Sequence, residues 1–270
     1  MTRLAFAAFA LAWVSVVLAQ GDGTDLPPIG TVVSGSFNVG GRSIPLPEGK
    51  FVLMAKAVGE PGLLEGDISK TRPKVLRVFL AQIEQQKLRA AVWASVALKP
   101  TSFRFTWVSQ PCRKEDTLFR ANLASGDGEN CLLVDHMLGT FSSRSQGIWK
   151  EAAAWLAEQQ VQLPVAVFIV ANVTRMEEWQ LLTASYAFNP RIYGCDAPRS
   201  RSWAESPWNK KSIDGDAQRV RFVESVTAWG KGVQHHFNEL VAGRQQSVEK
   251  AASIYGCASA QAALGSRQVP

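Results

Sequence analysis

The sequence lacks the short motifs that mark most enzyme and nucleotide-binding sites. It contains no GxSxG nucleophile elbow, no GxxxxGK[ST] phosphate loop, no HExxH zinc motif and no DxDxDG calcium loop. Only three histidines occur in 270 residues, which restricts zinc ligation and general acid–base catalysis. We therefore expect no cofactor, assign no metal ligand, and consider an enzyme the less favoured class.

Long apolar runs are also absent after residue 20, which excludes a multi-span membrane protein. Before that point Arg3 precedes an uncharged apolar stretch, residues 4–18, and Ala19 supplies a small residue for cleavage. This run of about 15 residues is shorter than the roughly 20 that span a bilayer. The pattern predicts a signal peptide over residues 1–19 and an exported product, periplasmic or secreted, without a transmembrane segment after cleavage.

Cysteine is scarce, and no CxxC pair exists, which argues against a thioredoxin-type redox site or a zinc ribbon. The four cysteines are Cys112, Cys131, Cys195 and Cys257. An even number in an oxidising compartment predicts two disulfides, and three pairings are possible. We favour Cys112–Cys131 and Cys195–Cys257; a free catalytic cysteine is the alternative.

Short β-rich runs separated by turn signals fill the first two-thirds of the chain. The predicted strands cover residues 31–39, 51–58, 74–83, 88–96, 103–108, 118–121, 131–137, 165–170 and 179–188. Most of the connections are short, so antiparallel pairing is expected. The mature chain, residues 20–270, is predicted to be a single α+β domain.

Apolar residues at helical spacing predict one helix that begins near Ile148 and ends before Pro164. A second helix is expected to begin at Asp214 or Asp216, with Gly230 and Gly232 marking a kink or break. An alanine-rich stretch, residues 245–263, is a candidate third helix. The expected fold is a predominantly antiparallel sheet from the N-terminal two-thirds, packed by two or three helices.

Residues 189–213 show neither the alternation of a strand nor the apolar spacing of a helix, and they are predicted to form a long irregular loop. Loops of this length are often binding segments. The candidate ligand contacts in this loop are Arg199, Arg201, Trp203 and Trp208. Alternatively, the two tryptophans anchor the loop to the core while Cys195 tethers it.

Positive charge is concentrated in residues 70–120, which hold eleven Lys and Arg against three Asp and Glu. Lys70, Arg72 and Lys74 alternate, so an extended chain places all three on one side. The predicted export makes nucleic acid an unlikely partner. The favoured partners are an anionic envelope polymer, a lipid headgroup or a partner protein, and the alternative is a solvated basic face.

Four residues carry the best enzymatic alternative. His235 and Glu239 are four residues apart on the second helix and share a face, and Asp135 or His136 is a candidate third ligand of a metal that activates water. Asp135 cannot be expected to orient His136, because neighbours on a strand point to opposite faces. The sequence thus predicts an exported binding or accessory protein of a bacterial-type cell envelope; the alternative is an envelope hydrolase, possibly metal-dependent.

Overall fold

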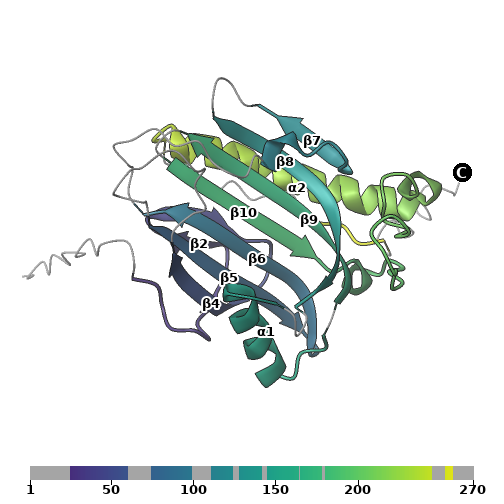
Figure 1. The fold of residues 1–270 in the computed structure, drawn as a ribbon, viewed down its shortest axis with the longest axis horizontal. Helices are drawn as coiled ribbons and strands as arrows, with labels where there is room; N and C mark the ends of the chain where they lie inside the picture. Colours follow the sequence, from purple (N-terminus) through teal and green to yellow (C-terminus); the bar gives the residue numbers. More distant parts are fainter. Residues whose placement is uncertain are drawn as a thin grey trace, which may run out of the picture.

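A computed structural model describes residues 25–59, 74–98, 111–123, 128–141, 145–163, 165–177, 180–244 and 253–257. Within these ranges the chain has an α+β fold, in which a large antiparallel sheet carries an α-helix on each face (Figure 1). The predicted signal peptide, residues 1–19, lies outside the described residues. No helix in the described part is both long and apolar enough to cross a membrane.

Eight strands form the main sheet, in the order β1-β4-β5-β6-β10-β9-β8-β7, and every neighbouring pair is antiparallel. Its strands are β1 (Val32–Val33), β4 (Phe51–Gly59), β5 (Val75–Glu84), β6 (Lys87–Ala97), β7 (Phe119–Asn122), β8 (Glu129–Thr140), β9 (Val165–Glu177) and β10 (Gln180–Phe188). A separate hairpin contains β2 (Ser36–Val39) and β3 (Arg42–Pro45). The expected antiparallel sheet is confirmed.

Two meanders meet in the middle of the sheet. Strands β4, β5 and β6 form the first meander, and β7, β8, β9 and β10 form the second. They join where β6 pairs with β10, with Ala94 opposite Ala184 and Ala90 opposite Phe188. This pairing brings the start of β6 next to the chain that leaves β10.

The two faces of the sheet have separate apolar cores. In β6, Val92 and Val96 belong to the larger core, which also holds residues of the hairpin, helix α2 (Ala217–Val241) and the 189–213 segment. Ala91 faces the opposite side and packs with helix α1 (Ile148–Glu158). Figure 1 shows the long α2 running along β8 and β9, while α1 lies across the β4 and β5 side.

Both predicted helices are present at the expected positions. Asp216 caps α2, because its side chain accepts hydrogen bonds from the backbone N–H groups of Gln218 and Arg219. The predicted break is wrong, since α2 is continuous helix through Gly230 and Gly232. A Cβ on Gly230 would lie 2.8 Å from Leu132 Cδ1, so this glycine allows the helix to approach β8 closely.

Some local expectations need correction. The predicted strand over residues 31–39 is divided into β1 and β2, with Gly35 between them at φ +74°. Residues 253–257 of the predicted third helix are not helical, and the remainder of that stretch lies outside the described residues, as does the predicted strand 103–108. The 3-10 helices η1 (Pro111–Arg113), η2 (Pro190–Tyr193) and η3 (Ile213–Gly215) complete the secondary structure of the described ranges.

The disulfides confirm the favoured pairing. Cys112 bonds to Cys131 of β8, and Cys195 bonds to Cys257. The first anchors η1 to the sheet, and the second ties the 253–257 segment to the chain that follows η2. Both bonds therefore fix irregular segments, which have little secondary structure of their own to hold them.

Candidate functional site: a cationic hollow at one end of the sheet

A hollow of about 330 Å³ lies where the starts of β6 and β9 meet η2 and the following chain. Its lining includes Lys87 of β6, Arg191 of η2 and Arg199 of the irregular segment. We call this site, defined by these three side chains, the cationic hollow. It joins one cation of the basic 70–120 region to two cations of the 189–213 segment.

Asn189 builds the junction between β6 and η2. Its backbone N–H donates to Arg89 O at 2.9 Å, and its side-chain Nδ2 donates to Leu88 O at 2.9 Å. Its Oδ1 accepts from the backbone N–H of Arg191 at 3.2 Å and thereby caps η2. A single buried amide therefore fixes the position of Arg191 relative to the first residues of β6.

A tight hairpin turn places Lys87 at the hollow. Gln85 and Gln86 between β5 and β6 have φ of 48° and 59°, as in the two-residue turns that suit the twist of paired strands. The carbonyl of Gln86 accepts from the backbone N–H of Gln162 at 2.8 Å. The turn is thus fixed against the chain that leads into β9.

The described residues that line the cationic hollow include no acidic side chain. Arg191 donates to the carbonyl of Ala197 at 3.2 Å, and within the described residues none of the three cations forms an ion pair with a carboxylate. Glu84 ends β5 directly opposite Lys87, but its carboxylate pairs with Arg89 at 2.6 Å. Like charges gathered on a concave surface produce a positive potential that attracts anions.

Of the other predicted basic residues, the structure describes Lys74 and Arg201, and neither lines the cationic hollow. Lys74 is exposed next to the start of β5, at the opposite end of the β5–β6 hairpin from Lys87. Lys70 and Arg72 lie outside the described residues. Arg201 is exposed and does not line the cationic hollow. Of the predicted ligand-binding cations that the structure describes, Arg199 is the one that lines this site.

The two tryptophans of the irregular segment have different environments. Trp208 is completely buried in the larger core, 6.0 Å from the ring of Phe222, so its indole is not accessible to a ligand in this structure. Trp203 is partly exposed, and its ring stacks on His136 with centroids 4.9 Å apart. Both side chains attach the segment to the body of the protein, as the anchoring alternative predicts.

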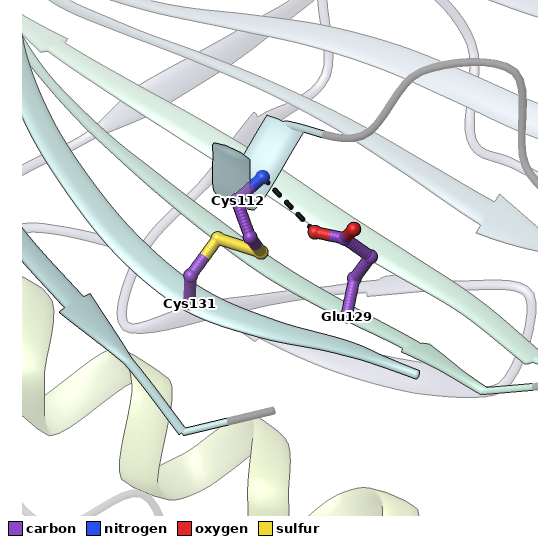
Figure 2. Close-up of side chains that lie close together, drawn as sticks. All are labelled: Cys112, Glu129 and Cys131. Atoms are coloured by element: carbon purple, nitrogen blue, oxygen red, sulfur yellow. Dashed lines mark hydrogen bonds between the residues drawn. A yellow bond between two sulfur atoms is a disulfide. The ribbon is translucent and has the colours of Figure 1, made fainter. Parts of the chain in front are cut away.

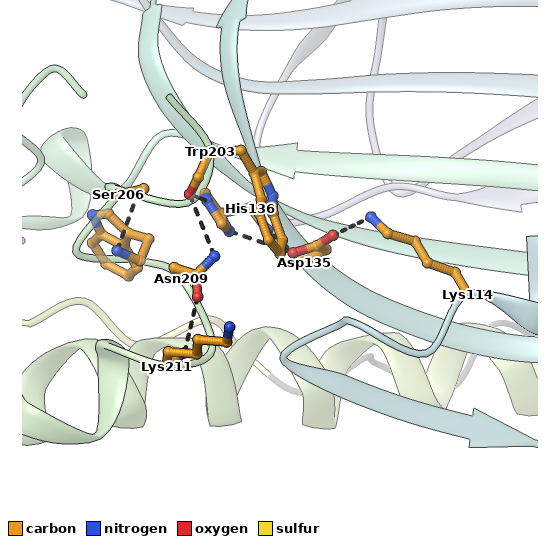
Figure 3. A network of polar contacts seen from close by, with 8 residues as sticks. Lys114, Asp135, His136, Trp203, Ser206, Asn209 and Lys211 are labelled. Carbon is orange, nitrogen blue, oxygen red and sulfur yellow. Dashed lines mark hydrogen bonds and ion pairs between the residues drawn. The ribbon is translucent and has the colours of Figure 1, made fainter. Parts of the chain in front are cut away.

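A polar network surrounds Trp203 at the edge of β8 (Figure 3). His136 Nε2 lies 3.2 Å from the carbonyl oxygen of Trp203, which also accepts from Asn209 Nδ2 at 3.3 Å. Asp135 accepts from the backbone N–H of His136 at 2.8 Å and forms an ion pair with Lys114. Burial alone raises the pKa of Asp135, but hydrogen bonds from His136 and Lys114 outweigh it and lower the pKa below its ordinary value.

This network has the geometry of a structural contact. The His136 side chain has no exposed surface, so a substrate cannot reach it. Its Nε2 faces the Trp203 carbonyl oxygen, which can only accept, so Nε2 carries a proton, and its Nδ1 lies 3.4 Å from Asp135 Oδ1. Adjacent strand residues were expected to point to opposite faces, but Asp135 Oδ1 lies close to both the backbone N–H and the imidazole of His136, which partly corrects that expectation. Ser206 Oγ accepts from the backbone N–H of Trp208 and does not contact the imidazole.

The proposed metal ligands do not come together. His235 is exposed on α2, and Glu239 forms a bidentate pair with Arg244 at 2.6 and 2.7 Å. The hydrogen bond from Arg244 lowers the pKa of Glu239. This half of α2 packs near Asn130, which contacts Gln234 and Asn238, whereas Asp135 and His136 lie further along β8. Among the described residues, these side chains therefore do not gather into a group that could hold a metal ion.

One cluster of potential metal-binding atoms does occur among the described residues, and it consists of Cys112, Glu129 and Cys131. Figure 2 shows that the two sulfur atoms are bonded to each other. Glu129 accepts from the backbone N–H of Cys112 at 3.0 Å. Metal binding needs thiolates, and a disulfide has none, so this cluster braces η1 against β8.

Sequence reasoning did not select Lys87 or Arg191 as ligand contacts. Lys87 belongs to the basic 70–120 region and Arg191 to the 189–213 segment, but nothing local in the sequence distinguishes them from the other cations of these stretches. The missing information was the pairing of β6 with β10, which joins residues about one hundred positions apart. No protein-family model matches the chain, and no curated protein or solved structure matches it either.

Proposed function

We propose that this chain is an exported protein of the cell envelope that acts by binding an anionic polymer, with the cationic hollow holding one anionic group. The observation that carries the proposal is the meeting of Lys87, Arg191 and Arg199 around a concavity whose described lining residues include no carboxylate. Two disulfides that brace irregular segments support an oxidising compartment. The rigid attachment of η2 through Asn189 supports a preformed site.

The shape of the site favours a polymer over a membrane surface. A headgroup-binding protein ordinarily combines basic residues with apolar side chains that enter the interface. The large apolar side chains that are exposed in the described residues are Ile29, Val32, Val58, Leu123 and Tyr255, and none of them lines the cationic hollow. A hollow of about 330 Å³ instead suits a single charged group on a flexible chain.

The test compares two variants with the same change in net charge. The first replaces Lys87, Arg191 and Arg199 with Gln, and the control replaces Lys150, Lys210 and Lys211, which are exposed elsewhere. Binding to labelled polyphosphate and to alginate, which present phosphate and carboxylate groups, is measured by fluorescence anisotropy over a range of salt concentrations. Binding to vesicles that contain phosphatidylglycerol is measured in parallel, to compare a membrane surface with the polymers.

We expect the first variant to lose at least about tenfold in affinity for one of the polymers, because each charge-assisted hydrogen bond contributes about 1.5–3 kcal/mol. Added salt should weaken wild-type binding. Equal losses in both variants, binding that is indifferent to salt, or preferential binding to the vesicles contradicts the proposal.

A further inference from the structure

A second concavity, larger than the cationic hollow, lies on the α2 side of the sheet. It encloses about 730 Å³ and is lined by the chain before β2, the turn after β3, the facing ends of β5 and β6, and the 253–257 segment. Tyr193 and Trp229 contribute aromatic surface to it. We call it the aromatic cleft. Its volume falls within the range of about 300–1,000 Å³ that is usual for small-molecule sites.

One wall of the aromatic cleft is held by covalent and backbone contacts. The Cys195–Cys257 disulfide fixes the 253–257 segment, and the backbone N–H of Cys257 donates to Tyr193 O at 2.8 Å. A Cβ on Gly256 would lie 2.4 Å from the same carbonyl oxygen, so only glycine permits this approach. Ser253 and Ile254 are therefore presented to the cleft in a fixed position.

Gln82 supplies an unused hydrogen-bond acceptor in the lining. Its Nε2 donates to the carbonyl of Glu48 at 3.1 Å, whereas its Oε1 is buried and has no hydrogen-bond partner. Gly49, at φ +118°, leaves the space that the Gln82 amide occupies.

The charges in the aromatic cleft are balanced. Arg89 lies over the ring of Tyr193, 4.4 Å from its centroid, and donates to Glu84 at 2.6 Å. Glu48 adds a carboxylate to the lining. Burial raises the pKa of Tyr193 although Arg89 opposes this effect, so the phenol is neutral. Unlike those of the cationic hollow, the described lining residues of this cleft therefore carry no excess of positive charge.

We propose that the aromatic cleft binds a neutral saccharide. Sugar hydroxyls both donate and accept, which matches the amide of Gln82 and the hydroxyls of Ser34, Ser36 and Ser253. The C–H faces of a sugar ring match the apolar surface of Leu46, Ile254 and Trp229. This site is separate from the cationic hollow and does not depend on the function proposed for it.

The experiment uses saturation-transfer NMR with maltose, cellobiose and N,N′-diacetylchitobiose as the probes, and glucose 6-phosphate as the anionic comparator. Two variants alter the cleft in different ways. Gln82→Leu removes the acceptor, and Ser34→Trp fills the cleft from an exposed position that is outside the core. The Lys87→Gln variant, which changes the cationic hollow, is the matched control. Near-UV circular dichroism confirms that each variant is folded.

We expect at least one neutral disaccharide to receive saturation from the wild-type protein and from Lys87→Gln, with binding weakened about tenfold or more in Gln82→Leu and in Ser34→Trp. Polyphosphate binding should be unchanged in both cleft variants, which separates this inference from the proposed function. The inference is overturned if none of the three disaccharides binds, if glucose 6-phosphate binds more tightly than they do, or if both folded cleft variants bind as the wild type does.

Discussion

The imidazole of His136 and the indole of Trp203 stack with their centroids 4.9 Å apart and their planes 16° apart. His136 belongs to β8, and Trp203 belongs to the irregular segment that begins after β10. The same pair is joined at 3.2 Å between Nε2 and the Trp203 carbonyl oxygen. The sheet edge therefore holds the segment at this point, while Trp208 holds it from within the core.

We expect the two tryptophans to differ in their contribution to stability. Trp208→Ala removes a wholly buried indole and should lower the free energy of unfolding by about 3–5 kcal/mol. Trp203→Ala loses a partly exposed stacking contact and should cost about 0.5–1.5 kcal/mol. Urea denaturation followed by circular dichroism measures both. Equal losses for the two variants are inconsistent with a buried anchor and a surface contact.

Asp135 should make stability depend on pH in the acid range. Its pKa is lower in the folded protein than the ordinary value of 3.8, so the folded state favours the carboxylate. The resulting stabilisation is present above pH 3.8 and is lost as the pH falls from there through the lower folded pKa. Because one proton is involved, the free energy of unfolding cannot change by more than about 1.4 kcal/mol per pH unit through this group.

Denaturation of Asp135→Asn between pH 2 and pH 7 measures this contribution, and the variant should show a shallower loss of stability in acid. Asp196→Asn is the matched control, because Asp196 is 78% exposed in a 3.5 Å pair with Arg219 and surface pairs contribute little. If the two variants have the same acid profile, Asp135 is not the source of the pH dependence.

The secondary structure could be predicted from local patterns, but the sites could not. Alternating apolar residues indicate β6, and Asp216 followed by apolar residues at helical spacing indicates α2, because strands and helices each bury a periodic face. The cationic hollow depends on Asn189 bonding to Leu88 and Arg89, and no local pattern reports which distant strand an asparagine will contact. Likewise, the free acceptor of Gln82 exists only because Glu48 is folded against it.

Gly230 shows how a tertiary contact overrides a local preference. Glycine weakens an isolated helix, which predicts a break, yet the helix is continuous because the missing side chain makes room for Leu132. Gly230→Ala should therefore destabilise the protein by about 1–3 kcal/mol through overpacking against β8. A Cβ at Gly232 meets no described atom within 4 Å, so Gly232→Ala should stabilise by up to about 1 kcal/mol. Thermal unfolding measures the change in stability of each variant. If Gly230→Ala stabilises the protein, the close contact with Leu132 is contradicted.

The two disulfides should differ in their effect because they close loops of different length. Cys112–Cys131 spans 19 residues and Cys195–Cys257 spans 62. Cross-linking limits the entropy of the unfolded chain more for the longer loop, so replacing both cysteines of each pair with Ser should cost about 3 and about 4 kcal/mol respectively. Urea denaturation of the two double variants tests this order.

Amide hydrogen exchange distinguishes the effect of the Cys195–Cys257 disulfide on the unfolded chain from its role in holding the 253–257 segment in the folded protein. Without the Cys195–Cys257 bond, the 253–257 segment keeps the hydrogen bonds from Cys257 N–H to Tyr193 O and from Ser225 Oγ to Tyr255 O. These bonds are weak compared with the covalent tether, so amide hydrogen exchange at Cys257 should accelerate in that variant and stay slow when Cys112 and Cys131 are replaced. Unchanged exchange at Cys257 in both variants means that the hydrogen bonds alone hold this wall of the aromatic cleft.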